Sequence, residues 1–425
     1  MRVDAAKPWN QGALDKSRLD LYCSRQLRLR ETMRRLDVPA LLILDPIDIF
    51  YATGARNMLF FSMRTPARYL LLFAEGPAFL YEYFGCEHLA ADLPTIDHIV
   101  PAEGLCHTSS GGDVQGASKR FTSQILAAVG SIDPTIRTLA IDRFPLSAID
   151  ALRASGFALT HSDRVLQEAR MIKTALEIPY MREAMRRVEA AVQQMEQSLE
   201  PGRTEAEAWA DYHYKFMATE GQYVATRLFQ TGSRTFPYFQ ECGDRIMENG
   251  DLVCLDTDAL GYEGYAVDFS RSFICGDATP TPSQRKLYSL AREQLETNAA
   301  ALAPGIPYEE LADLAWPIPD AYQESRYYCV GHGLGVSGEF PNIPHKVSGK
   351  PYPLSGTIEP GMVICLESYV GCREAGEGIK LENQYLIHEN GVEQMSIYPF
   401  DQELGVYGIQ LKRALGLLAL FWQLQ

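Results

Sequence analysis

Short apolar runs separated by polar turns fill the first 170 residues of the chain. Apolar residues recur at helical spacing in the Arg-rich segment Ser17–Leu36, which predicts a helix. Asp45-Pro46 predicts a turn, and Pro145–Gly156 predicts a further helix. Apolar runs predict strands at Ala40–Leu44, Tyr69–Phe73, Ala78–Tyr83 and Thr138–Ile141. This alternation of strands and helices is typical of a small α/β domain.

The rest of the chain begins with helical patterns and ends with strand-like ones. An amphipathic helix is predicted from about Tyr180 to Leu199, and a capping box at Thr204–Glu207 begins the next helix. The Leu-Xaa-Pro-Gly phrase that ends the first helix recurs near Leu302 and hints at a duplicated unit. Later apolar runs predict strands at Leu252–Leu255, Tyr265–Ile274, Met362–Glu367 and Ile379–His388.

The change of pattern predicts a domain boundary between residues 165 and 180. We expect an N-terminal α/β domain over residues 1–170, a second domain over residues 171–405 and a tail over residues 406–425. The apolar tail predicts a terminal helix that packs on the body or on a partner subunit, or else a non-native extension.

Composition narrows the classes of function. The chain has 39 Lys and Arg against 54 Asp and Glu, and the net charge of −15 opposes binding to nucleic acid. Its most apolar stretch, Ala414–Trp422, is far shorter than the roughly 20 residues that span a bilayer, and the N-terminus lacks the apolar segment of a secretory signal. Nine cysteines without a Cys-Xaa-Xaa-Cys motif predict buried, reduced thiols. We expect a cytoplasmic protein that binds a small molecule.

Carboxylates at the ends of predicted strands are the first candidates for chemistry. Asp256 and Asp258 follow an apolar run, and residues two apart in a strand face the same side. The chain then turns back, so a returning strand can place Asp268 beside Asp258. Several carboxylates on one apolar face repel each other, and a cation removes that repulsion.

Three more residues extend this pattern. His332 lies between glycines that allow close backbone approach, and Glu367 and Glu382 lie in apolar strand-like runs. Each of these residues alone is more often solvated or structural than functional. Their occurrence in order, each next to a predicted strand, indicates a metal site. Oxygen-rich ligands with one imidazole favour Mn, Fe or Co over structural Zn.

In this order and context the residues resemble those of the pita-bread metalloenzymes, which include methionine aminopeptidase, aminopeptidase P, prolidase and creatinase. The matching phrases are Gly264–Ser272, Gly331–Gly335 and Glu359–Met362, and Ile172–Ile178 resembles the linker of the prolidase and creatinase branch. The resemblance implies an α+β fold, with a smaller creatinase-like α/β domain before a C-terminal pita-bread domain. It also implies a homodimer with two divalent ions, Fe or Mn before Zn or Co, bound by Asp258, Asp268, His332, Glu367 and Glu382.

Within this superfamily the sequence looks like the DddP-type dimethylsulfoniopropionate lyases. The phrases that carry the likeness are Asp45–Thr53, Phe239–Gly243 and Tyr398–Phe400. By this resemblance Asp256 is a sixth metal ligand, and Tyr327 is similar to an active-site Tyr of the lyases. Packing in an aromatic core is the alternative role for Tyr327.

Two departures from the related families bear on activity. Prolyl peptidases of this fold carry extra histidines that bind the scissile carbonyl oxygen and the oxyanion, whereas Phe239–Glu241 and Ser337–Glu339 contain none. The lyases place a catalytic Asp where this chain has Gly338. We favour the adjacent Glu339 as the base, on the expectation that a loop absorbs the offset of one residue. A metal-bound hydroxide is the alternative base.

The predicted function is a metal-dependent lyase that removes a proton next to the carboxylate of a small zwitterion and releases a sulfide. The alternative is a dinuclear metallohydrolase that resembles prolidase or cleaves small amides. A non-catalytic relative is disfavoured because all five ligand positions are filled. We predict a structural ion pair for Arg271 and a solvated loop for His345. For Arg56 and Arg68 we predict surface salt bridges rather than contact with a substrate across a dimer interface.

Overall fold

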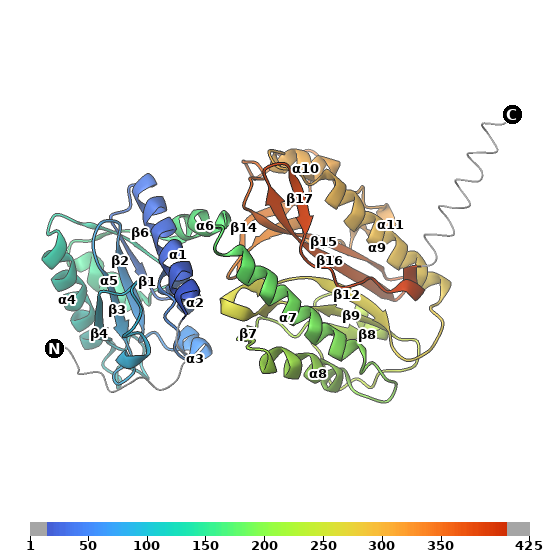
Figure 1. Cartoon of the computed structure of the whole chain (residues 1–425), viewed down its shortest axis with the longest axis horizontal. Coiled ribbons are helices and arrows are strands. Elements are labelled where there is room, and N and C mark those ends of the chain that lie inside the picture. Colours follow the sequence, from blue (N-terminus) through green and yellow to red (C-terminus); the bar gives the residue numbers. More distant parts are fainter. Residues whose placement is uncertain (1–14, 406–425) are drawn as a thin grey trace. The chain divides into compact units, whose positions relative to one another are not determined.

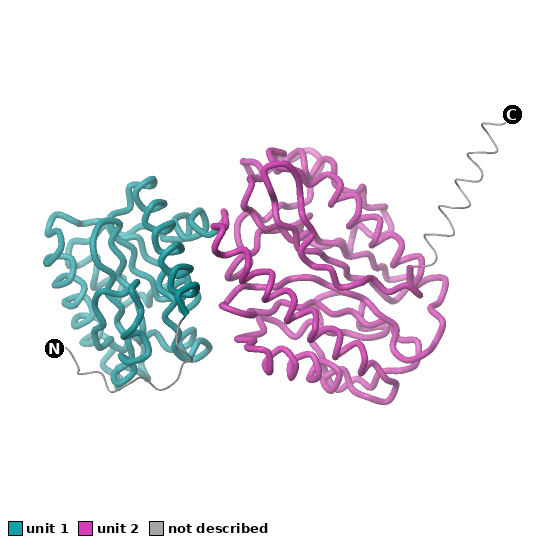
Figure 2. Tube along the Cα trace, viewed as in Figure 1, with its two compact units in different colours: residues 1–170 teal, residues 171–425 magenta. Residues whose placement is uncertain are grey.

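A computed structural model describes residues 15–405 of the chain. The chain divides into two units between Arg170 and Met171 (Figures 1 and 2). No helix among the described residues is long and apolar enough to cross a bilayer. The tail helix that the sequence predicts at residues 406–425 lies outside the described residues.

A six-stranded mixed sheet with the order β4-β3-β2-β1-β5-β6 forms the centre of the first unit. Its strands are β1 (Ala40–Ile43), β2 (Tyr69–Phe73), β3 (Ala78–Glu82), β4 (His98–Pro101), β5 (Thr138–Ile141) and β6 (Ala158–His161). Every residue of β1 and β2 is buried, which explains why these strands are continuous apolar runs. The four strands predicted in this part of the chain are confirmed.

Helices surround this sheet, as Figure 1 shows. They are α1 (Lys16–Arg35), α2 (Pro46–Thr53), α3 (Leu59–Arg64), α4 (Val114–Ile132), α5 (Leu146–Ala154) and α6 (Asp163–Met171). The turn predicted at Asp45-Pro46 is wrong, because the Asp45 side chain accepts hydrogen bonds from the amides of Ile47 and Asp48 and caps α2. Pro in the first turn and Asp before it are also helix start signals.

Three sheets form the second unit, with the strand orders β14-β13-β15-β16-β17, β12-β9-β8 and β11-β10-β7. The strands are β7 (Tyr223–Val224), β8 (Phe229–Thr231), β9 (Leu252–Asp256), β10 (Ala259–Leu260), β11 (Ala266–Val267), β12 (Ser270–Ile274), β13 (Cys329–Leu334), β14 (Gly338–Pro344), β15 (Val363–Cys372), β16 (Glu377–His388) and β17 (Gly391–Gln394). Antiparallel sheets with separate helices confirm the α+β class.

Two helical segments of similar design cover these sheets. The helices are α7 (Ile178–Glu196), α8 (Glu205–Ala218), α9 (Pro282–Ala301), α10 (Tyr308–Leu314) and α11 (Asp320–Gln323). The capping box at Thr204 is confirmed, and Thr281 forms a second one at the start of α9. Helix α9 packs on β15 and β16 in a core that contains Leu295, Ile364 and Leu381. This core fixes the two strands that carry Glu367 and Glu382.

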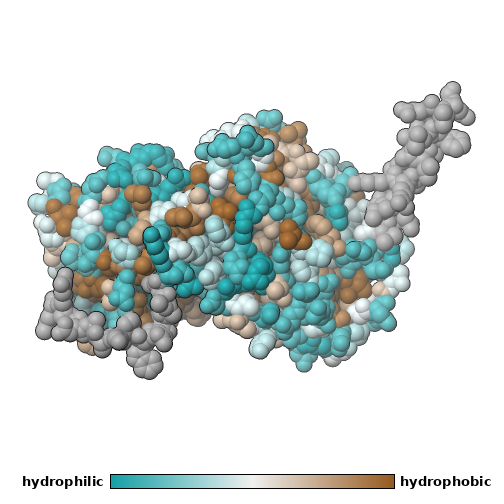
Figure 3. All heavy atoms as spheres, in the orientation of Figure 1, coloured by the Kyte–Doolittle hydropathy of each residue, from teal (hydrophilic) through white to brown (hydrophobic). Residues whose placement is uncertain are grey.

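Hydrophobic side chains on the surface are dispersed. On the face shown in Figure 3 they lie singly or in small groups among hydrophilic residues of both units. One group at α3 exposes Met58, Phe60, Phe61 and Met63. Single exposed apolar residues are ordinary in folded proteins.

The cysteines are all free, but they are not all buried. Cys23 is exposed, and Cys86, Cys106 and Cys372 are partly exposed. The predicted burial is confirmed for the other five, which are Cys242, Cys254, Cys275, Cys329 and Cys365.

Asp142 is an unusual acid in the first unit. Its Oδ2 accepts hydrogen bonds from the amides of Leu44 (2.8 Å) and Asp45 (2.7 Å), and its buried Oδ1 has no hydrogen-bond partner among residues 15–405. Burial raises the pKa of Asp142 from 3.8 to about 7, although the two amides act in the opposite direction.

Stability should therefore fall as the pH rises towards 7, because a carboxyl group whose pKa is raised by folding stabilises the folded state most when protonated. The free energy of unfolding should decrease by at most about 4 kcal/mol between pH 4 and pH 8. Asp142→Asn can keep both amide hydrogen bonds, so its unfolding midpoint should vary less with pH than that of the wild type. Asp150→Asn, at an exposed position, should keep the wild-type profile. Identical profiles for all three proteins would contradict this explanation.

Candidate metal centre

Strands β15 and β16 place two carboxylates directly opposite each other. Glu367 pairs with Glu382 in the antiparallel register, and both side chains are buried. Like charges at directly opposite positions destabilise a sheet unless another group compensates them. Residues two positions away share their faces, which brings Cys365 and Lys380 to the same site.

Asp268 joins them because a break interrupts its strand. The continuous strand predicted over Tyr265–Ile274 is wrong, since β11 ends at Val267 and β12 begins at Ser270. In the break, the Phe269 amide donates to Thr257 Oγ1 (3.1 Å) rather than to a neighbouring strand. Asp268 is thereby released from sheet pairing and lies beside His332.

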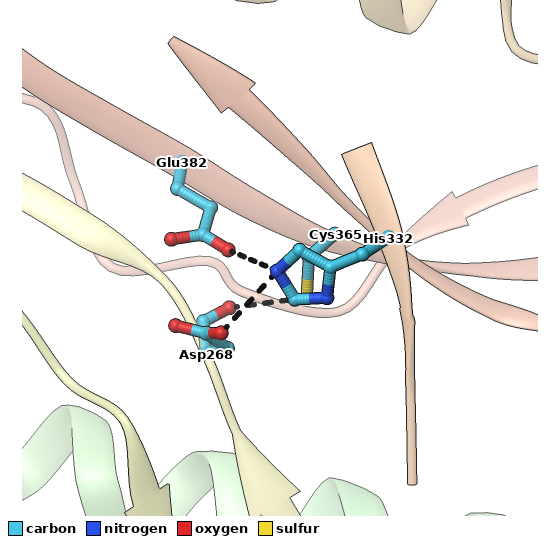
Figure 4. A group of neighbouring side chains, drawn as sticks. All are labelled: Asp268, His332, Cys365 and Glu382. Atoms are coloured by element: carbon cyan, nitrogen blue, oxygen red, sulfur yellow. Dashed lines mark hydrogen bonds and ion pairs between the residues drawn. The ribbon is translucent and has the colours of Figure 1, made fainter. Parts of the chain in front are cut away.

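His332 of β13 lies at the centre of these acids (Figure 4). Its Nε2 is 3.3 Å from Glu367 Oε1, 3.6 Å from Asp268 Oδ2 and 3.8 Å from Glu382 Oε1. Its Nδ1 lies 3.1 Å from the Gly333 carbonyl oxygen, which favours the proton on Nδ1 and leaves Nε2 as the ligand atom.

The glycines on either side of His332 are required by close packing of strands, as the sequence predicts. A Cβ on Gly331 would lie 2.3 Å from the Cys365 carbonyl oxygen, and one on Gly333 would lie 2.4 Å from the Phe340 carbonyl oxygen. Real side chains do not tolerate such contacts, so only glycine allows the imidazole to reach this position.

The chemistry of the donor set fits a metal ion. Ligand atoms of Asp268, His332, Cys365 and Glu382 all lie within 4.8 Å of one another (Figure 4). Asp268 Oδ1 and Glu382 Oε1 are buried and have no hydrogen-bond partner among the described residues. A divalent cation is the partner that would satisfy both oxygens.

Cys365 is a neighbour of this group that the sequence analysis did not select. Its thiol donates a hydrogen bond to the Asp268 carbonyl oxygen (3.6 Å), and burial together with Glu382 raises its pKa well above the ordinary value. The residue therefore remains a thiol beside the ligands. Its position two residues before Glu367 was the available signal.

The pKa values of the acids reflect crowded carboxylates. Burial and Glu382 raise the pKa of Asp268 well above its ordinary value, and burial and Glu367 raise that of Glu382 to about 8. Burial lowers the pKa of His332, but Glu367 and Glu382 outweigh it and raise the value to about 9. A bound divalent ion would favour the charged acids and the neutral imidazole.

Asp256 and Asp258 reach this region by a route that the sequence analysis did not predict. Strand β9 ends at Asp256, and Asp258 has a left-handed backbone with φ of 35°, so strand alternation does not align them. Ser270 donates to Asp256 Oδ1 (2.9 Å) and Tyr238 donates to Oδ2 (2.6 Å). Thr226 donates to Asp258 Oδ2 (2.5 Å), and burial and Asp256 raise the pKa of Asp258 to about 7.

A wall of aromatic rings lies beside the acids. Tyr327 is buried with its ring centre 4.8 Å from Lys380 Nζ, 5.4 Å from Phe239 and 4.8 Å from Tyr328. Phe239 and Tyr328 are exposed, and Tyr238 links the wall to Asp256 through its hydroxyl. Burial and Glu367 raise the pKa of Tyr327, so this residue remains a phenol. The ring of Tyr327 packs among other aromatic rings beside the acids, and its role in the active site stays a prediction.

Glu339, the base predicted from the sequence, has other partners. Lys173 Nζ donates to its Oε2 (2.7 Å) and the Val336 amide donates to its Oε1 (3.0 Å), with both side chains of the ion pair almost fully buried. The expectation of a flexible loop is wrong, because Gly338 begins β14. Side chains at neighbouring strand positions face opposite sides, so the side chain of Glu339 points in a different direction from one at position 338.

Arg271 and His345 also differ from the predictions. Arg271 is buried and donates to the Tyr398 and Glu382 carbonyl oxygens and to Asn383, so its role is structural but the predicted ion pair is wrong. His345 is partly buried, with Nε2 unbonded among the described residues, and burial lowers its pKa to about 4. It lies in the loop after β14, as predicted, but it is partly buried rather than solvated.

Of the two arginines of the first unit, Arg68 differs from its predicted surface salt bridge. Arg68 forms a fully buried ion pair with Glu82 (2.7 Å) and donates to the Ala55 carbonyl oxygen (3.2 Å). Arg56 lies over the ring of Phe50, 4.2 Å from its centre. The surface salt bridge predicted for Arg68 is therefore wrong, whereas that for Arg56 stays a prediction.

Comparison with known proteins finds relatives along most of the chain. The Creatinase/Prolidase N-terminal domain matches residues 25–172, and Metallopeptidase family M24 matches residues 179–389. The dimethylsulfoniopropionate lyase DddP of Roseovarius nubinhibens is 33% identical over 382 residues, which cover 89% of this chain and 86% of that protein. DddP of Roseobacter denitrificans is 32% identical over 93% of this chain and 90% of that protein.

The fold is also that of solved structures. The prolidase from Pyrococcus horikoshii superimposes with a TM-score of 0.69 at 22% identity, over 90% of this chain and 99% of that one. This similarity confirms the two-domain fold predicted from the sequence.

Proposed function

Since the chain belongs to the pita-bread superfamily, in the family of the DddP dimethylsulfoniopropionate lyases, we propose that it is a metal-dependent lyase acting on dimethylsulfoniopropionate or a close zwitterionic relative. The observation that carries the proposal is the buried group of Asp268, His332, Glu367 and Glu382 in a chain similar to DddP along most of its length.

We propose that this group belongs to a site for two divalent ions. The residues that would hold them are Asp258, Asp268, His332, Glu367 and Glu382, with Asp256 as an added ligand. We propose Fe or Mn rather than Zn or Co, as the resemblance to the superfamily implies. When bound, the ions would hold the substrate carboxylate and increase the acidity of the adjacent C–H bond.

The aromatic wall suits the other end of such a substrate. A sulfonium group is a permanent cation without hydrogen-bond donors, and aromatic faces are the protein groups that bind such cations. Tyr327 is buried beside the acids, while Phe239 and Tyr328 expose part of their rings. Tyr327 is therefore our candidate for direct contact with the substrate.

The reaction would transfer one proton and break one C–S bond. A base takes the proton from the carbon next to the carboxylate, its electron pair forms a C=C bond, and dimethyl sulfide leaves with the C–S electrons. Glu339 is the proposed acceptor, but it accepts a proton only when its ion pair with Lys173 opens. We therefore expect the wild-type protein to be a slow lyase. Assay of the metal-loaded protein for dimethyl sulfide tests the proposal, which fails if a protein with bound metal releases none from any sulfonium acid tested.

The alternative is a prolidase-like hydrolase, favoured by the fold and the M24 match alone. We expect Gly-Pro and Ala-Pro to be cleaved at least about a hundredfold more slowly than by an ordinary prolidase, because the histidines that would stabilise the oxyanion are missing. Gln240, at one of these positions, donates instead to the Arg234 and Pro237 carbonyl oxygens. Amino acid release measured with Mn-loaded protein tests this, and rapid cleavage would favour the hydrolase.

The assembly and location of the enzyme complete the proposal. We propose a cytoplasmic homodimer, as its resemblance to the superfamily implies. Sedimentation of the purified full chain tests the dimer.

A further inference from the structure

One buried cation in the centre has no part in the proposed reaction. Lys380 of β16 is fully buried, and its Nζ lies 2.6 Å from Glu367 Oε2, 3.0 Å from Glu382 Oε2 and 2.8 Å from Ser270 Oγ. Three acceptors therefore match the three protons of the ammonium group. Asp256 Oδ2 lies slightly further away, at 3.5 Å.

The hydroxyl of Ser270 ties these groups together. It accepts from Lys380 and lies 2.9 Å from Asp256 Oδ1 and 3.0 Å from Glu382 Oε2. On the other side, Tyr238 donates to Asp256. The lysine thus touches carboxylates on β9, β15 and β16, and fixes the distance between strands of two different sheets.

Charge gives this lysine a specific role. The centre contains five carboxylates, those of Asp256, Asp258, Asp268, Glu367 and Glu382. Two divalent ions would neutralise four of these charges. One negative charge then remains, and the ammonium group of Lys380 neutralises it. Asp256 is the carboxylate that the prolidase-like ligand set lacks.

We propose that Lys380 is a positioning residue of the metal centre, where it offsets the charge of Asp256 and holds Glu367 and Glu382 in place. The inference rests on the proposed metal centre but not on the substrate. It predicts that Lys380 and Asp256 form an energetic unit, in which loss of one partner harms the protein and loss of both is tolerated.

The test is a double-mutant cycle of Lys380→Met and Asp256→Asn, measured by thermal unfolding of the purified full chain. Lys380→Met should lower the unfolding midpoint by roughly 5–10 °C, because it leaves buried carboxylates without their cation. Asp256→Asn should lower the midpoint in the wild-type background and raise it in the Lys380→Met background. Lys380→Arg should keep most of the wild-type midpoint, and Lys350→Met, at an exposed position, should change nothing.

The outcomes separate this inference from the proposed function. A midpoint that falls by the same amount when Asp256→Asn is added to either background would overturn the role of Lys380. If Lys380→Met does not fold, recovery of folded protein in the double variant replaces the midpoint as the readout, and failure of the double variant to fold overturns the inference. Bound Mn per chain, measured on the wild type, tests the metal centre separately, because the unfolding cycle can succeed even where metal binding fails.

Discussion

Replacing Asp268 with Ala should remove most of the divalent metal from the protein and reduce its activity at least about a hundredfold. Asp268 Oδ1 is buried without a hydrogen-bond partner among the described residues, and Oδ2 lies 3.6 Å from the imidazole of His332. Asp268 lies in the break between β11 and β12, where it is not part of a paired strand. Metal content after dialysis, together with turnover of the substrate, measures the effect.

Stability provides a second readout for the same variant. Burial and Glu382 raise the pKa of Asp268, so removal of this carboxylate should not destabilise the metal-free protein. Added Mn²⁺ should raise the unfolding midpoint of the wild type, because a ligand that binds only the folded state stabilises it. It should leave Asp268→Ala unchanged. Asp244→Ala, which removes an exposed acid of equal charge, should behave as the wild type, and unchanged metal content in Asp268→Ala would refute the ligand assignment.

The order of the candidate ligands could be predicted from the sequence, whereas the geometry that brings them together could not. Glu367 and Glu382 lie in strands that were visible as apolar runs, and their pairing follows from one hairpin. Asp258 was selected because the strand was expected to continue through it. Strand β9 instead ends at Asp256, and Asp258 itself has a left-handed backbone with φ of 35°. A local pattern identifies the residue type and the segment, but it does not give the backbone angles that aim the side chain.

Partners distant in sequence were the main omission. Lys380 is embedded in a strand-like run, and only the three-dimensional structure shows that it meets three carboxylates. Lys173 and Glu339 are 166 residues apart, so neither segment indicates the other. In both cases a charged residue in an apolar segment was the available signal, because such a residue is rarely buried without a partner.

Gly338→Asp should increase the release of dimethyl sulfide from dimethylsulfoniopropionate. Position 338 is exposed at the start of β14, and a Cβ added there meets no atom within 4 Å, so the strand accepts the side chain without strain. By the resemblance to the lyases, an Asp at this position would supply a base that needs no ion pair to open, and a positioned base contributes typically 10²–10⁴-fold to the rate. We expect an increase of at least about tenfold, measured in the headspace above metal-loaded protein, with Gly338→Asn as the control of similar size without a carboxylate.

Glu339→Gln distinguishes the two roles of the neighbouring acid. This substitution leaves the buried ammonium of Lys173 without its carboxylate, so we expect a lower unfolding midpoint together with lower activity. The double variant Lys173→Met and Glu339→Gln removes both charges and should recover the midpoint. If Glu339 is the base, the double variant regains its stability but remains inactive. If the ion pair is purely structural, the double variant regains both its stability and its activity. If neither the wild type nor Gly338→Asp releases dimethyl sulfide while both retain their metal, dimethylsulfoniopropionate is excluded as the substrate. The metal centre would then act on a different small molecule.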